Sequence, residues 1–305
     1  MIANQYALIR REFWEHRSLY VVPAVLGLVI VLIEMTGQAA ISAFGTQIDM
    51  TLLSASNIDT HQRATIISAL MTAFASLFLI EMWILSVFYA LDSLYAERKD
   101  KSILFWRSMP VTDAETVISK LLTAIIAIPI VTIIFVALTH VLVLLVISIW
   151  IGTRGASPWH LIWSAVPLVD NWTATILYIF AQALWLSPFV GWFLLVSAFA
   201  KRSPLLMAVL PIIVLPMLEK SILNSRFLFD AIVVRSVHIP ISHSVDFDKL
   251  FSKDALAHSV DHGISLLGML DIGRFLASPG LWLGLLVCAL LSAGAIYVRR
   301  FRDES

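Results

Sequence analysis

Long apolar runs alternate with short polar segments along this chain. An apolar run of about 20 residues is long enough to cross the hydrocarbon core of a bilayer as a helix. Six transmembrane helices are therefore predicted, over residues 19–37, 64–91, 117–151, 173–200, 205–218 and 281–298. The fifth run is short and contains Pro211 and Pro216, which favours a tilted or interrupted helix.

Residues 1–18 precede the first run and carry a helical pattern of their own. Ile2, Tyr6, Ile9 and Phe13 are spaced by four, three and four residues, which places them on one face of a helix. Charged side chains occupy much of the remaining surface. An amphipathic segment beside a transmembrane run predicts a helix that lies along the membrane surface.

Proline and small residues indicate how the predicted spans bend and pack. Pro129 is expected to kink the third span, and Pro188 with Gly191 to bend the fourth. The sixth span carries a stripe of small residues at four-residue spacing: Gly280, Gly284, Cys288 and Ser292. Small residues let helices approach closely, so we interpret the stripe as packing within one bundle, with dimerisation as the alternative.

Composition supports an integral membrane protein and excludes several other classes. Hydrophobic residues make up 59% of the chain and charged residues 14%, and the mean hydropathy is +0.88. Soluble domains carry about 25% charged residues. The net charge is zero and there is no basic tail, so no nucleic-acid partner is predicted. Cys288 is the only cysteine, which excludes a disulfide within the chain.

Lysine and arginine are distributed unequally between the two sides of the predicted bundle. The segments on one side hold most of them: Arg10, Arg11, Arg17, Arg98, Lys99, Lys101, Arg107, Lys120, Lys201, Arg202, Arg299, Arg300 and Arg302. The two short loops on the other side hold only Arg63 and Arg154. Because positive residues are retained in cytoplasmic loops, both termini are predicted to be cytoplasmic.

The largest polar interruption in the first half spans residues 92–116. After a cluster of charges, apolar residues predict a short interfacial helix that ends before Met109 and Pro110, because the residue before proline avoids helical geometry. Thr112 and Glu115 have the spacing of a capping box, which predicts the start of the next helix. The charges place this loop in water or against a protein partner.

The same loop resembles the cytoplasmic coupling loop of ABC-2-type transporter permeases, the membrane subunits of bacterial ABC exporters without a fused ATPase domain. The resemblance rests on the pair Glu97 and Arg98, the short apolar helix, the step from Met109 to Pro110, and the acidic stretch that leads to Lys120. The layout of the whole chain fits the same family.

The resemblance implies an all-α polytopic fold with one transmembrane permease domain over residues 1–305. Residues 1–18 would form an interfacial elbow helix, and 92–116 the coupling loop between spans two and three. Residues 219–279 would be an extracytoplasmic segment with amphipathic or re-entrant helices before the sixth span. The chain would reside in the bacterial cytoplasmic membrane as a homodimer or paired with a related permease, in contact with lipid.

The resemblance also implies separate ATP-binding subunits docked beneath the bundle. ATP and magnesium would be bound by those subunits, and this chain would hold no cofactor. The residues expected to couple the two subunits are Glu97, Arg98, Lys99 and Lys101 as polar contacts, with Phe105 and Trp106 as buried anchors. The exporters of this family carry drugs, lipids, polysaccharides and peptides.

Motifs for chemistry within the chain are absent from the sequence. The spacing from Gly263 to Gly268 is followed by Met269 and Leu270, so no Walker A lysine follows it and the chain is not predicted to be an enzyme. His258 and His262 would share one face of a helix, but such residues are more commonly solvated, and no metal site is predicted.

Charged and polar groups inside the predicted spans form a second set of candidates. A charge in mid-bilayer is costly, so Glu81, Glu34 and His140 are candidates to line a translocation path. The alternative is that they form hydrogen bonds that hold helices together.

Two other functions are alternatives to the permease. In a proton-coupled secondary transporter, Glu81, Glu34 or His140 would carry protons, but spans four to six do not repeat spans one to three. In a membrane-embedded sensor or assembly factor, the outer segment would bind a ligand.

Overall fold

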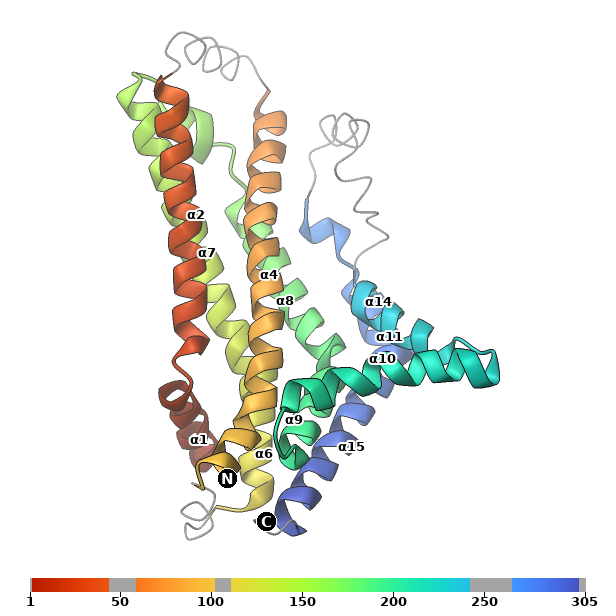
Figure 1. Cartoon of the computed structure of the whole chain (residues 1–305). Coiled ribbons are helices and arrows are strands. Elements are labelled where there is room, and N and C mark those ends of the chain that lie inside the picture. The colour runs from red at the N-terminus through yellow and green to blue at the C-terminus, as the bar shows by residue number, and fades with distance from the viewer. Residues whose placement is uncertain (1, 44–58, 102–110, 242–264, 302–305) are drawn as a thin grey trace.

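The computed structural model describes residues 2–43, 59–101, 111–241 and 265–301, and every regular element in those ranges is helical. Four long helices form the centre of the molecule: α2 (Ser18–Ala43), α4 (Thr60–Lys99), α7 (Ile128–Thr153) and α8 (Leu168–Trp185). They run side by side (Figure 1). Helix α1 (Ile2–Glu15) begins and α15 (Pro279–Phe301) ends at one end of this bundle, which we call the base.

The predicted membrane spans are present as long apolar helices. Five stretches are long and apolar enough to cross a membrane: Ser18–Gln38, Thr60–Lys99, Asp113–Thr153, Pro204–Leu223 and Pro279–Phe301. A sixth results if the bent pair α8 and α9 (Ser187–Phe199) counts as one span. The chain is thus an all-helical, multi-pass membrane protein.

Helix α4 extends well beyond its apolar run. It has 40 residues, which corresponds to about 60 Å and twice the thickness of a hydrocarbon core. Ile80, Ile84 and Phe88 project from one exposed side, as expected for a lipid-facing surface. The helix continues to Lys99, so the first part of the predicted loop 92–116 is a helical extension of the span.

The third predicted span consists of three consecutive helical pieces. Helix α6 (Asp113–Leu122) leads into a π-helical turn, η1 (Thr123–Ala127), and then into α7. The wide turn lies directly before Pro129, whose ring lacks an N–H and crowds the preceding turn of a regular helix. The predicted kink is therefore a local widening of the helix.

The capping box predicted ahead of this helix is confirmed. The Thr112 hydroxyl accepts a hydrogen bond from the Glu115 backbone N–H at 3.2 Å, and the Thr112 N–H donates to the Glu115 carboxylate at 3.0 Å. Both interactions satisfy backbone donors that a helix start would otherwise leave unpaired.

The predicted bend of the fourth span is also confirmed. Helices α8 and α9 meet at Leu186 with an angle of 49°, and Pro188 lies in the first turn of α9. Gly191 packs directly against α15, because a Cβ atom there would lie 3.0 Å from the Cys288 carbonyl oxygen. The small-residue stripe of the sixth span thus packs within one bundle.

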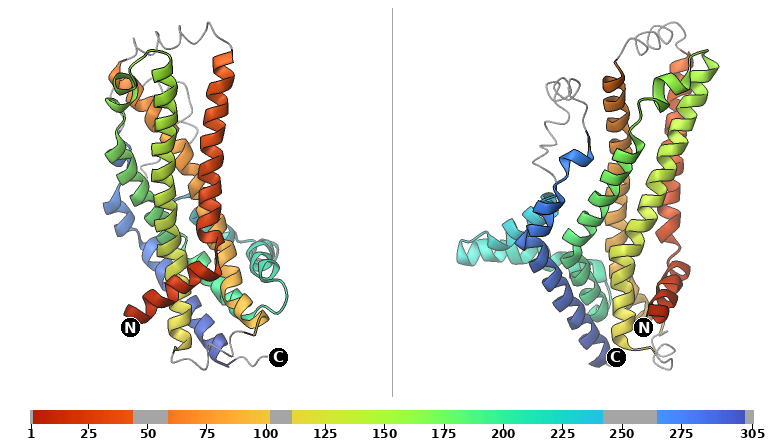
Figure 2. Two further views of the ribbon diagram at one scale, coloured as in Figure 1. Left: turned by 90° about the vertical axis from the view of Figure 1, so that its left-hand side faces the viewer. Right: turned by 180° about the vertical axis from the view of Figure 1, so that it is seen from behind.

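Helix α10 (Pro204–Leu223) does not lie alongside the other spans. It contains both Pro211 and Pro216 yet is continuous, and it turns back at Asn224 into α11 (Phe227–Val237). The two helices form a hairpin that projects sideways from the bundle (Figures 1 and 2). Glu219 ties the hairpin together by accepting hydrogen bonds from the N–H groups of Phe227 and Leu228.

The described residues directly before the sixth span are attached to the start of α8. At the start of α8, Asp170 accepts hydrogen bonds from the Ser265 hydroxyl at 2.6 Å and the Leu266 N–H at 2.8 Å. The described part of this segment contains two short helices, η3 (Leu267–Met269) and α14 (Ile272–Ala277). Helices are thus present in the described part of the predicted segment 219–279, and residues 242–264 of this segment lie outside the described ranges.

Arg235 of α11 fastens the hairpin to the other end of α8. Its guanidinium donates to the carbonyl oxygens of Trp185 at 2.9 Å and Gly280 at 2.8 Å, and it lies 4.4 Å from the centre of the Trp185 ring. The Trp185 indole N–H donates in return to the Arg235 carbonyl oxygen. Gly284 of α15 provides the space, because a Cβ atom there would overlap the guanidinium.

Replacing Gly284 by alanine is expected to expel the Arg235 guanidinium and to reduce the free energy of unfolding by about 1–3 kcal/mol. Thermal unfolding of the purified protein in detergent measures this change. Gly37→Ala on α2 is the matched control, since a Cβ atom there meets no other atom within 4 Å and alanine favours a helix. Equal stability of Gly284→Ala and the wild type would contradict this packing.

Candidate functional site

A group of buried and half-buried charged side chains lies at the base, where α1, α4, α6 and α15 converge. These residues come from distant parts of the sequence and are held in direct contact with one another. We call them the ion cluster: Arg11, Glu12, Glu97, Asp113, Lys120 and Arg299. Buried charges require partners, so this group has the strongest physical constraints in the described chain.

Lys120 of α6 lies at the centre of the ion cluster. Its side chain is fully buried, and its ammonium nitrogen contacts Glu12 of α1 at 2.9 Å and Glu97 of α4 at 3.1 Å. Glu12 is also buried, and its second carboxylate oxygen accepts a hydrogen bond from the Tyr89 hydroxyl at 2.8 Å. One lysine thus joins three helices.

Glu97 is the most highly connected acid of the ion cluster. Besides Lys120, it contacts the guanidinium groups of Arg299 at 2.6 Å and Arg11 at 3.1 Å. Arg299 in turn contacts Asp113, the first residue of α6, at 2.9 Å. The three acids and three bases of the ion cluster balance in charge.

This balance keeps Glu97 ionised although it is buried. Glu97 follows the apolar run of α4, so it lies outside the stretch suited to hydrocarbon. Burial alone would raise the pKa of its carboxyl group, but the charges of Lys120 and Arg299 outweigh burial and lower the pKa to about 2. Glu97 is therefore ionised throughout the physiological range.

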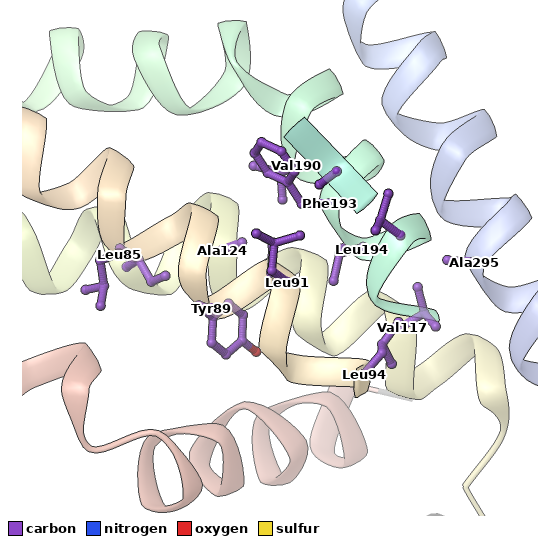
Figure 3. Packing of buried hydrophobic residues seen from close by; sticks show 14 of the residues in the cluster. Leu85, Tyr89, Leu91, Leu94, Val117, Ala124, Val190, Phe193, Leu194 and Ala295 are labelled. Carbon is purple, nitrogen blue, oxygen red and sulfur yellow. The ribbon is translucent and has the colours of Figure 1, made fainter. Parts of the chain in front are cut away.

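Apolar packing surrounds the ion cluster. Tyr89 and Leu94 of α4 and Val117 of α6 belong to one buried hydrophobic cluster, together with Leu194 of α9 and Ala295 of α15 (Figure 3). Excluding water strengthens the ion pairs and makes the loss of any partner expensive.

The orientation of α1 follows from these contacts. The sequence pattern places Ile2, Tyr6, Ile9 and Phe13 along one face, and Tyr6 of this row is 69% exposed. Leu8 and Glu12 form the face that is buried against the bundle. Glu12 is held there by Lys120 and Tyr89. The predicted helix is thus present, and its position along the membrane surface stays a prediction.

The base end of α4 has a second anchor on α9. Arg98 donates to the carbonyl oxygens of Ser197 at 2.7 Å and Ala200 at 2.8 Å, which satisfies acceptors at the end of α9. Tyr95 donates from its hydroxyl to the Arg202 carbonyl oxygen at 2.7 Å. Lys101 then adopts φ 56°, a left-handed conformation typical of helix ends.

The predicted coupling residues fall into three groups in the structure. Glu97 and Arg98 face inward and bind other helices, whereas Lys99 and Lys101 are exposed. Phe105 and Trp106 lie outside the described residues. The structure thus fixes both ends of the α4–α6 loop, residues 100–112, through α4 and α6.

The three predicted path residues do not meet. His140 is buried between helices, with one ring nitrogen 3.0 Å from the Met71 carbonyl oxygen and the other accepting from the Trp172 indole N–H. Glu81 follows Met71 by ten residues on α4, which is about 15 Å along the helix. Glu34 accepts a hydrogen bond from Gln38 one turn further along α2.

Glu81 differs from the other two path residues in its hydrogen bonding. Both of its carboxylate oxygens are buried and have no hydrogen-bond partner among the described residues. His140 has partners for both ring nitrogens, which matches the alternative interpretation of a residue that holds helices together. Of the three, Glu81 alone has buried side-chain oxygens without a hydrogen-bond partner among the described residues.

Within the described residues, one group of side chains has metal-ligand spacing. Ligand atoms of Glu12, Glu15 and His16 lie within 4.8 Å of one another. Glu12 is bound to Lys120 and Glu15 to Arg11, so these carboxylates already have cationic partners. His258 and His262 lie outside the described ranges.

Sequence reasoning missed most of the ion cluster. Arg299 is separated from Glu97 by 202 residues, and no local spacing connects them. The available signal was the presence of charged residues at the ends of several apolar runs. Comparison with known proteins finds no family model, curated protein or solved structure that matches this chain.

Replacing Lys120 by methionine is expected to reduce the free energy of unfolding by about 3–5 kcal/mol, because Glu12 and Glu97 lose their shared cation. Thermal and denaturant unfolding in detergent measure the change. Glu12→Gln combined with Lys120→Met should recover part of the loss. Lys99→Met, at an exposed lysine on the same helix as Glu97, is the control. If Lys120→Met unfolds like this control, the ion cluster contributes no net stability.

The lowered pKa of Glu97 predicts a specific dependence of stability on pH. A carboxyl whose pKa falls from 4.5 to about 2 on folding stabilises the protein above pH 4.5 and loses this effect as pH falls toward 2. The difference in melting temperature between wild type and Glu97→Gln should be constant from about pH 7 to 5 and then narrow. A difference that stays constant down to about pH 3 would rule this out.

Proposed function

We propose that this chain is the membrane-spanning permease subunit of an ABC-2-type transporter, an exporter driven by ATP hydrolysis in separate ATP-binding subunits. The ion cluster carries the proposal, because it binds both ends of the α4–α6 loop to helices from the two ends of the chain. A loop that receives force from a motor must be attached rigidly to the helices that it moves.

Helices α4 and α6–α7 are suited to transmit such force. Each forms a stretch of about 60 Å from the base to the opposite end of the bundle, and the α4–α6 loop joins their base ends. A displacement of the loop would move both helices together, because Lys120 and Glu97 bind them to each other at 3.1 Å. A translocation path between these helices would then open to the other side of the membrane.

In this proposal, some coupling residues contact the ATP-binding subunit and others hold the loop on the bundle. The exposed Lys99 and Lys101 contact the ATP-binding subunit, with Phe105 and Trp106 as anchors. Glu97 and Arg98 act from inside by holding the loop on the bundle. ATP and magnesium are bound by the partner subunit, and a second copy or a related permease completes the path.

The distribution of basic residues sets the orientation. We infer that the base lies in the cytoplasm of a bacterial cell, since the helix ends and the turn that meet there carry most of the positive charges: Arg98, Lys99, Lys201, Arg202 and Arg299. The short loops at the other end contain few positive charges. Both termini and the α4–α6 loop are then on the side where ATP is available.

One observation favours a second candidate, a proton-coupled secondary transporter. Glu81 presents a buried carboxylate without a hydrogen-bond partner in the described chain, which is the kind of group that takes up and releases protons. In an ABC transporter, the same carboxylate would face the translocation path. The energy source separates the two candidates.

Reversing the charge of Lys99 and Lys101 is expected to weaken association with the ATP-binding subunit by about tenfold or more. In the proposal these lysines contact acidic groups of that subunit, and glutamate at the same positions would repel them. The tagged chain is purified from native membranes, and the co-purified Walker A subunit and the ATPase activity are quantified for Lys99→Glu with Lys101→Glu.

Lys201→Glu with Arg202→Glu is the matched control, because both residues are exposed at the base but lie on the α9–α10 turn. Transport by the purified chain alone, driven by a pH gradient and abolished by Glu81→Gln, would replace the ABC proposal with the second candidate.

A further inference from the structure

Helix α1 has one face that is buried against the bundle and one that is exposed. One face carries Leu8 and Glu12 into the bundle. The other carries Tyr6, Arg10 and Trp14 at four-residue spacing, which aligns them along the helix. Tyr6 is 69% and Trp14 70% exposed, although both are aromatic. This exposed row is not explained by packing within the described chain.

The exposed row is positively charged. The Arg10 guanidinium lies 5.1 Å from the centre of the Trp14 ring, and Arg17 is exposed just beyond the end of α1. Neither arginine forms an ion pair within the part of the chain that the structure describes. Glu15, an exposed acid that lies between these two arginines in the sequence, is paired with Arg11 at 2.7 Å.

The position of α1 would bring the exposed row into contact with a membrane surface. The helix crosses the base at an angle to α2 (Figure 2), and the exposed Tyr20 and Val21 begin α2 beside it. Tyrosine and tryptophan favour the depth of lipid headgroups, and arginine favours phosphate. A row that combines tyrosine, tryptophan and arginine is suited to the boundary between the hydrocarbon core and the charged headgroups.

We propose that the face of α1 formed by Tyr6, Arg10 and Trp14, extended by Arg17, binds the headgroups of anionic phospholipids. Arg10 and Arg17 have no carboxylate partner among the residues that the structure describes, and their positive charge selects anionic over zwitterionic headgroups. The aromatic rings set the depth of the helix. This inference requires only that the chain is a membrane protein and does not depend on the proposed transport function.

Lipid binding would also reach the ion cluster. Arg11 and Glu12 follow Arg10 directly on α1 and contact Glu97 and Lys120. A headgroup that holds the outer face of α1 therefore stabilises the position of the inner face. The abundance of anionic lipid would then adjust how firmly the α4–α6 loop is held.

Spin-labelled lipids test the proposal with the full-length protein in phosphatidylcholine vesicles. Electron spin resonance gives the association constant of labelled phosphatidylglycerol relative to labelled phosphatidylcholine. The wild type is expected to prefer phosphatidylglycerol, and Arg10→Gln with Arg17→Gln should reduce the preference at these sites by about fivefold or more. High salt should weaken the wild-type preference, because it screens exposed charges.

Arg300→Gln is the matched control. Arg300 is an exposed arginine at the base that lies 5.4 Å from the centre of the Phe301 ring, so it resembles Arg10 in charge and stacking but lies on α15. Its replacement should leave most of the preference intact. An unchanged preference in the double variant, or an equal loss in Arg300→Gln, would overturn the assignment to α1.

Discussion

The buried contact between Lys120 and the two acids Glu12 and Glu97 constrains the rest of the structure. Charges removed from water are tolerated only with partners in close geometry, so α1, α4 and α6 must meet where these side chains meet. Arg299 adds α15 to the same point through Glu97 and Asp113. The first and last helices of the chain are thereby fixed on either side of the α4–α6 loop. The ion cluster makes the base of the bundle a single unit.

Away from the base, hydrogen bonds to backbone groups replace the ion pairs between side chains. The segment that includes α11, η3 and α14 is attached to α8 at both ends, through Asp170 at its start and Arg235 at its end. These anchors use backbone groups, which the bend between α8 and α9 makes available near Trp185. The bent pair α8 and α9 therefore carries this segment, whereas α4 carries the α4–α6 loop.

Features that depend on neighbouring residues could be predicted from the sequence. The capping box of Thr112 and Glu115, the bend near Pro188 and the apolar runs are all determined within a few residues. Contacts between distant residues could not be predicted, because Glu97 and Arg299 share no pattern. Length and apolarity predicted α10 as a span but did not determine its direction across the bundle. The face of α1 that packs against the bundle could not be predicted either, since the partner of Glu12 lies on α6.

The distance between α1 and the α4–α6 loop tests the central claim most directly. Spin labels at the exposed positions Trp14 and Lys101, introduced as cysteines with Cys288 replaced by serine, report this distance by double electron–electron resonance. If the ion cluster fixes the loop to α1, the distribution is narrow with Lys120 present and broad in Lys120→Met. An equally narrow distribution in both proteins would contradict the account.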